Sequence, residues 1–156
     1  MNPRVGLGFD VHPFTEEQGR RLVLGGVTME GPGLAGHSDA DVVAHAVADA
    51  ILGAAGLGDI GGHFPDTDPA YAGVDSMELL GRVVLSASTH YEIGNVDVTV
   101  VLEAPKLAPH RTAMESRLGD VVGAPVSVKA KRAESLGALG RGEGVACFAV
   151  ALLVPR

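Results

Sequence analysis

The sequence has no tryptophan, a single cysteine and few aromatic residues, which make up 4% of its 156 residues. Cys147 cannot form an intramolecular disulfide, so the composition fits a reducing compartment. This residue lies in VACFAVALLV, where a small buried side chain is the simpler interpretation than a nucleophile. Positive charge is also scarce: the formal net charge is -7. That charge argues against nucleic acid as the main partner, because phosphate backbones attract basic surfaces.

Long hydrophobic runs are absent as well. The longest, Val145–Val154, is too short to span a bilayer as a helix, and MNPRVGLGFD lacks the layout of a signal peptide. We therefore expect a cytoplasmic protein with no membrane contact. The length of the chain and its 46% hydrophobic content predict one folded domain over residues 1–156.

Hydrophobic periodicity and turn residues predict strands and helices that alternate irregularly in one α/β or α+β layer pair. The longest expected helix starts with Ser38 as its N-cap and continues through VVAHAVADAILGAA; its apolar surface indicates that it is buried. Segments 56–71 and 135–144 are expected to be loops because they are rich in glycine. Strands are expected at 5–9, 21–29 (with a turn at Gly25-Gly26), 96–104, 125–131 and 145–154, and two further helices at 75–88 and 111–123.

The first candidate site is a set of acids and histidines. Asp10 and His12 share one face of an extended segment, and Asp41, His45 and Asp49 share one face of the longest helix. Asp10, His12 and His45 would leave a fourth tetrahedral position free for substrate, as catalytic zinc requires, with the other two acids orienting the ligands. The alternative is a half-exposed strand end and a hydrogen-bonded core histidine.

Two glycine-containing loops carry further candidates. His37 and Ser38 in GHSDAD lie at a helix start, where unpaired N–H groups favour an anion such as phosphate; alternatively, Ser38 only caps the helix. Asp59, Asp66 and Asp68 in GDIGGHFPDTD suit hydroxyl binding or help with a cation, but solvated turn acids have the same pattern.

Positive charge gathers toward the C-terminus, against the acidic average. Lys129, Lys131 and Arg132 alternate along a strand end and Glu134 follows them. Cations with one acid could bind a phosphate and a Mg²⁺ ion, although a charged strand end in solvent is an equal alternative.

Four motifs together resemble the 2-C-methyl-D-erythritol 2,4-cyclodiphosphate synthase family over essentially the whole chain. In order they are GFDVHPF, GHSDADVVAHAVADAILGAAGLGDIGGHFPDTDP, GNVDVTVVLEAPKLAPH and LGRGEG. The resemblance implies an α+β fold, a two-layer sandwich in which a mixed sheet packs on about three helices and faces the axis of a homotrimer. It implies a lyase of the non-mevalonate route to isoprenoid precursors, which cyclises 4-diphosphocytidyl-2-C-methyl-D-erythritol 2-phosphate and releases CMP.

The resemblance also implies the cofactors and the roles of individual residues. Zinc would be held by Asp10, His12 and His45, and a second divalent ion, Mg²⁺ or Mn²⁺, by Glu134. His37 would act in the transition state. Asp10, His12, His37 and Glu134 are expected to bind the substrate as well. The other expected substrate-binding residues, of which the 104–107 loop comes from a neighbouring subunit, are Ser38, Asp59, Gly61, Phe64, Asp66, Asp68, Ala104, Pro105, Lys106, Leu107 and Arg141.

One departure from the family pattern concerns the residues before Glu134. Where the family commonly has three threonines, this chain has Lys131, Arg132 and Ala133; we hypothesise that the Arg132 guanidinium replaces the missing hydroxyl. Ala138 is smaller than the hydrophobic residue usual there, which makes a lipid-like ligand in the trimer cavity less expected.

Two alternative functions remain open from the residues alone. One is a zinc-dependent phosphoesterase, and the other is a non-catalytic trimeric protein that binds an isoprenoid phosphate. The family also occurs in plastids, but no transit peptide is seen in this sequence.

Overall fold

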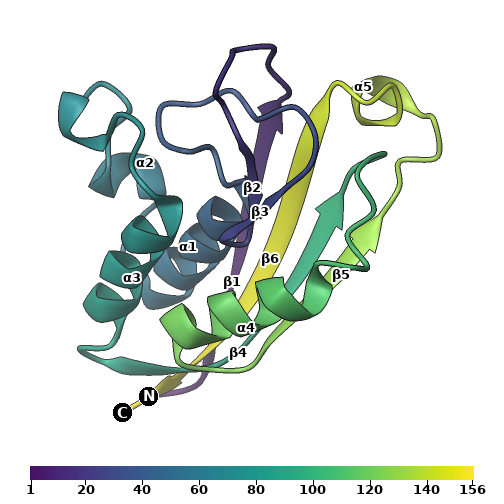
Figure 1. Ribbon diagram of the computed structural model, residues 1–156. Coiled ribbons are helices and arrows are strands. Elements are labelled where there is room, and N and C mark those ends of the chain that lie inside the picture. The colour runs from purple at the N-terminus through teal and green to yellow at the C-terminus, as the bar shows by residue number, and fades with distance from the viewer.

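A four-stranded mixed sheet forms the centre of the computed structural model, which describes residues 1–156 (Figure 1). The strand order is β1-β6-β4-β5; β6 pairs antiparallel with β1 and β4, and β4 pairs parallel with β5. A separate hairpin, β2–β3, turns at Gly25-Gly26 as expected. The strands span Arg4–Pro13 (β1), Leu22–Leu24 (β2), Val27–Met29 (β3), Tyr91–Val101 (β4), Val126–Lys131 (β5) and Gly144–Pro155 (β6).

Three long helices cover one face of this sheet (Figure 1). Helix α1 (Val42–Ala55) packs on β1 and β6 and lies beside α3 (Ser76–Ala87), while α4 (Arg111–Val122) packs on β5. Ten of the residues of α1 are buried, so this helix carries much of the core between the two layers. The predicted α+β class with a mixed sheet on about three helices is confirmed. No helix is long and apolar enough to cross a membrane.

The start of α1 differs from the prediction, because Asp41 and not Ser38 is its N-cap. The Asp41 carboxylate accepts hydrogen bonds from the N–H groups of Val43 and Ala44, both at 3.1 Å. It also accepts from Gly25 at 2.9 Å and Gly26 at 2.7 Å, which ties the β2–β3 turn to the helix. Burial raises the pKa of Asp41 to about 6, against the effect of these hydrogen bonds. Asp41 is therefore a structural anchor and not an orienting acid for a metal ligand.

Two glycines allow β1 to approach α1 very closely. Gly6 and Gly8 face the helix, and a Cβ at either position would overlap the carbonyl oxygens of Ala50 and Ala46. Alternate residues of a strand share one face, so Asp10 and His12 continue this row of side chains toward α1. The close packing at the glycines is what brings the two residues beside the helix that carries His45.

Two predicted loops contain short regular elements. Segment 56–71 includes α2 (Ile60–His63) and a 3₁₀ turn (Pro69–Tyr71), and 135–144 includes α5 (Gly137–Gly140). Asp59 and Asp68 cap the first two, accepting hydrogen bonds from Gly62 and Ala70. Each element is too short to show a hydrophobic period in the sequence.

Candidate active site

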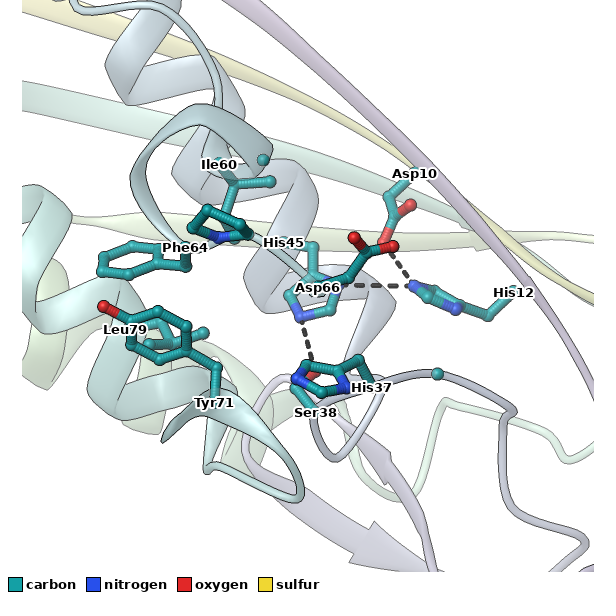
Figure 2. Close-up of a pocket in the computed structure, with 13 residues that line it drawn as sticks. Asp10, His12, His37, Ser38, His45, Ile60, Phe64, Asp66, Tyr71 and Leu79 are labelled. Carbon is teal, nitrogen blue, oxygen red and sulfur yellow. Dashed lines mark hydrogen bonds and ion pairs between the residues drawn. The ribbon is translucent and has the colours of Figure 1, made fainter. Parts of the chain in front are cut away.

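Asp10, His12 and His45 meet between β1 and α1, as predicted. Asp10 Oδ2 lies 2.9 Å from His12 Nε2 and 2.9 Å from His45 Nδ1, and the two nitrogens are 3.4 Å apart (Figure 2). One ligand atom from each residue falls within 4.8 Å of the others. A carboxylate oxygen and two imidazole nitrogens at this spacing suit a divalent metal ion such as zinc, so the three residues form a candidate metal site.

His12 presents Nε2 to this site because its other nitrogen is occupied. Nδ1 donates a hydrogen bond to the Ala35 carbonyl oxygen at 2.7 Å. Burial lowers the pKa of His12, but the hydrogen bond and the negative charge of Asp10 outweigh it, so the net shift is upward. Burial likewise opposes ionisation of Asp10, yet hydrogen bonds from His12 and His45 lower its pKa to about 2. In the absence of a metal ion, the ionised carboxylate is therefore the favoured form.

The loop that carries His37 and Ser38 forms one wall of a cavity above the candidate metal site. Arg20 holds this loop: its guanidinium donates to the carbonyl oxygens of Gly36 and Ser38, the latter at 2.6 Å. His37 is exposed, and its Nε2 lies 2.9 Å from the Asp68 carbonyl oxygen. Arg20 could not be selected from the sequence, because its partners are backbone atoms that only the fold brings near.

The cavity has a volume of about 440 Å³ and joins residues from β1, the 36–38 loop, α1, α2 and α3. It brings together most of the predicted residues of the first half of the chain: Asp10, His12, His37, Ser38, His45, Gly61, Phe64 and Asp66 (Figure 2). Tyr71 and Leu79 also line it, although no sequence pattern marks them as site residues. Phe64 packs edge-to-face on Tyr71 with ring centroids 5.4 Å apart, forming an apolar wall opposite the histidines.

The predicted orienting role of Asp49 is wrong. Its carboxylate accepts a hydrogen bond from the Ile60 N–H at 2.7 Å, at the start of α2. Burial raises the pKa of Asp49. Asp49 therefore holds the α2 segment that closes the cavity, while Asp59 and Asp68 serve as caps and do not line it.

A second, smaller cavity of about 260 Å³ lies at the carboxyl ends of β4 and β5. Its lining includes Pro105, Lys106, Leu107, Lys131 and Arg132. Within one chain, these residues do not reach the cavity above the metal site. Figure 1 shows the ends of β4 and β5 on the opposite side of the fold from α2.

Arg132 is held at the edge of this second cavity by Glu103. Arg132 Nε and Nη2 donate to Glu103 Oε2 at 3.1 and 2.8 Å, and the Ala133 N–H donates to Oε1 at 2.8 Å. The hydrogen bond from Arg132 lowers the pKa of Glu103 and raises that of Arg132. The third guanidinium nitrogen, Nη1, makes no hydrogen bond with Glu103 and can donate to an anion.

Glu134 and Arg141 are exposed and line neither cavity. Glu134 adopts φ +53°, an uncommon left-handed conformation for a residue with a side chain. Arg141 forms an ion pair with Glu143 on the surface. Their predicted substrate-binding roles therefore stay predictions.

Comparison with known proteins places the chain in a family. The YgbB family profile matches residues 3–154. The chain is 53% identical over 155 residues to 2-C-methyl-D-erythritol 2,4-cyclodiphosphate synthase from Thiobacillus denitrificans, covering 96% of each protein. It is 54% identical to the bifunctional enzyme IspD/IspF from an Anaeromyxobacter species, but spans only 39% of that longer relative.

A solved structure gives the same result. The chain superposes on IspF from Plasmodium falciparum, a structure described as a CDP complex, with a TM-score of 0.86 and 34% sequence identity. That match covers 99% of this chain and 97% of the other. The chain therefore belongs to the YgbB family, the family of 2-C-methyl-D-erythritol 2,4-cyclodiphosphate synthases that its motifs predict.

Proposed function

We propose that this chain converts 4-diphosphocytidyl-2-C-methyl-D-erythritol 2-phosphate to 2-C-methyl-D-erythritol 2,4-cyclodiphosphate and CMP. The observation that carries the proposal is the cavity in which a metal-binding triad, Asp10, His12 and His45, lies beside the His37–Ser38 loop in a member of this family. In this reaction an oxygen of the substrate's 2-phosphate forms a bond to the β-phosphorus. The bond from that phosphorus to the bridging oxygen breaks, and CMP leaves with the electron pair.

The chain's own residues bind and orient the phosphates and need not supply a nucleophile. This agrees with Cys147, which is buried and whose pKa is raised by burial. Asp10, His12 and His45 would hold zinc, which when bound supplies positive charge to a phosphate oxygen. The Asp68 carbonyl oxygen accepts a hydrogen bond from His37 Nε2, which leaves Nδ1 as the ring nitrogen that would contact a phosphate oxygen.

We also propose that the second half of the site comes from a neighbouring subunit of a homotrimer. The Ala104–Leu107 loop would bind the cytidine side of the substrate, and Glu134 would hold the second divalent ion, Mg²⁺ or Mn²⁺. The distance between the two cavities within one chain supports this arrangement. The sheet face not covered by helices supports it too, because it exposes large apolar side chains from β1 and β6: Val5, Leu7, Phe9, Val11, Phe148 and Val150.

Mixing two inactive variants tests the function and the shared site together. His45→Ala and Lys106→Ala should each abolish most CMP release. Trimers co-expressed from equal amounts of both should recover about a quarter of native turnover, because only sites with both intact halves work. Failure of the unaltered chain to release CMP would contradict the activity. Native activity without recovery in the mixed trimers would contradict only the sharing of sites between subunits.

A further inference from the structure

The ring of His45 is held on the side away from the candidate metal site by two buried serines. His45 Nε2 lies 2.8 Å from Ser76 Oγ and 3.1 Å from Ser38 Oγ. The two hydroxyl oxygens are themselves 3.2 Å apart. Ser76 is 1% exposed and Ser38 is 7% exposed, so water does not compete for these contacts.

Asp39 sets the direction in which the Ser76 hydroxyl donates its hydrogen bond. Its carboxylate accepts a hydrogen bond from the Ser76 hydroxyl, and it also accepts from the Ser76 N–H at 3.3 Å and the Asp41 N–H at 3.1 Å. A carboxylate can only accept, so the single hydroxyl proton of Ser76 goes to Asp39. Ser76 Oγ must then accept a hydrogen bond from His45 Nε2–H. With Nε2 committed to Ser76, Nδ1 is the nitrogen that faces Asp10 and is available to a metal ion.

We propose that Asp39 and Ser76 are positioning residues for the metal site, acting as a hydrogen-bonded relay from Asp39 through Ser76 to His45. The relay fixes both the orientation of the imidazole and the tautomer that offers Nδ1 as a ligand. Partners of this kind raise the basicity of a metal-bound histidine and are worth roughly 10- to 100-fold in metal affinity. The inference rests on the proposed function, in which Asp10, His12 and His45 hold zinc.

The helix ends do not account for these contacts. Asp75 caps α3, accepting from the Met77 N–H at 2.8 Å, and Asp41 caps α1. The Ser76 hydroxyl is therefore not needed to satisfy the start of its own helix. Asp39 lies in the loop before α1 and precedes Ala40, which is held at φ +58°. A positive φ at a non-glycine residue is uncommon, and such residues cluster at functional sites.

Zinc affinity of intact variants tests the relay. The zinc-loaded protein is titrated with a chromophoric chelator of known affinity. Ser76→Ala should weaken zinc binding about 10-fold, and Asp39→Asn, which keeps the shape of the side chain but removes its charge, should weaken it by a smaller factor. The matched control is Asp75→Asn, which disturbs the same helix start without contacting His45. It should lower the melting temperature and leave zinc affinity native.

A spectroscopic readout separates positioning from simple loss of stability. In the zinc-loaded protein, the Nε2 proton of His45 should appear by ¹H–¹⁵N NMR as a slowly exchanging resonance. It should broaden or disappear in Ser76→Ala and persist in Asp75→Asn. Native zinc affinity in Ser76→Ala, or an equal loss in both variants, would overturn the relay. Failure of the unaltered chain to bind zinc would instead contradict the metal site of the proposed function, and the relay with it.

Discussion

His12 and His45 each offer a different nitrogen to the same point, and the surrounding structure sets that choice. The Ala35 carbonyl oxygen accepts a hydrogen bond from His12 Nδ1, which leaves Nε2 to bind a metal ion. The serines occupy His45 Nε2, which leaves Nδ1. A preset pair of tautomers avoids the cost of reorienting the rings when a metal ion binds. Asp10 then completes a donor set with one charge and two neutral nitrogens.

The pKa shifts of Asp10 and His12 predict how metal binding depends on pH. Without metal, the pKa of Asp10 is lowered from 3.8 to about 2. The stability that this carboxylate contributes is therefore fully present above pH 3.8 and is lost as the pH falls through about 2. The pKa of His12 is raised from 6.5, so its contribution is present below 6.5 and lost as pH rises through the higher folded-state value. Zinc requires neutral His12, so zinc should raise the melting temperature more at pH 8 than at pH 6.

Thermal denaturation with and without zinc at both pH values measures this effect. The His12→Gln variant provides the control: it removes this candidate ligand, so the zinc-induced increase should be small at both pH values. An equal zinc-induced increase at pH 6 and pH 8 in the native protein would show that protonation of His12 does not compete with the metal.

Arg132 stands where the family commonly has a threonine, and its Nη1 remains available beside Lys106. We predict that Arg132→Ala lowers turnover about 10-fold, the effect of losing one charge-assisted hydrogen bond to a phosphate. Arg82→Ala is the matched control, since Arg82 is also exposed and paired with a glutamate, Glu78, but lies on α3. Steady-state CMP release measures both variants. Native turnover in Arg132→Ala would mean that this arginine only pairs with Glu103.

At the scale of elements, the metal site depends on how closely β1 packs against α1. Gly8→Ala should cost about 1–3 kcal/mol or more in the free energy of unfolding and weaken zinc binding, because the new Cβ displaces the strand that carries Asp10 and His12. Gly53→Ala in α1 is the control: nothing lies within 4 Å of its Cβ, so it should stabilise the helix by about 0.5–1 kcal/mol. Urea denaturation and zinc titration of both variants make the comparison. Native zinc affinity in Gly8→Ala would show that the candidate metal site does not depend on the close packing of β1 on α1.

Elements with strong local signals could be predicted from the sequence. The turn at Gly25-Gly26, the start of α3 at Asp75 or Ser76 and the end of α4 at Gly123 all appear as expected. The start of α1 could not be predicted, because Ser38 and Asp41 are both good caps. Contacts between Asp41 and the distant β2–β3 turn decide between them.

Part of the candidate site could likewise be predicted from the sequence, and part could not. The spacing of Asp10, His12 and His45 indicated these residues as candidate metal ligands, since two regular elements present them on defined faces. The partners of His45 could not be inferred, because Asp39 and Ser76 are 37 residues apart and only the packing of α3 on α1 joins them. Tyr71 likewise enters the cavity through the 3₁₀ turn that the sequence pattern did not reveal.

At the scale of the whole molecule, one face of the sheet is covered by helices and the other exposes an apolar surface. Leu7 and Val5 are each 67% exposed there, which is unusual for contiguous large hydrophobic side chains on an isolated subunit. A homotrimer would bury this face and bring the two cavities of neighbouring subunits together. Assembly and activity should therefore be lost together.

Leu7→Glu tests this dependence. The buried charge should dissociate the trimer and lower turnover by at least 10-fold, because a charge is costly in an apolar interface. Leu85→Glu is the matched control: Leu85 is 73% exposed but lies on α3, away from the sheet face. Light scattering with chromatography measures the mass of each variant. A monomeric Leu7→Glu protein with native turnover would contradict a site shared between subunits.

The identity of the phosphorus-containing product tests the central claim most directly. The purified chain is incubated with 4-diphosphocytidyl-2-C-methyl-D-erythritol 2-phosphate, Zn²⁺ and Mg²⁺ and followed by ³¹P NMR. We predict the paired resonances of a cyclic diphosphate together with CMP, which would also show that Lys131-Arg132-Ala133 can replace the threonines. Open-chain phosphate products would indicate a zinc phosphoesterase. No turnover by a zinc-bound trimer would indicate a binding protein, and either result would contradict the cyclase.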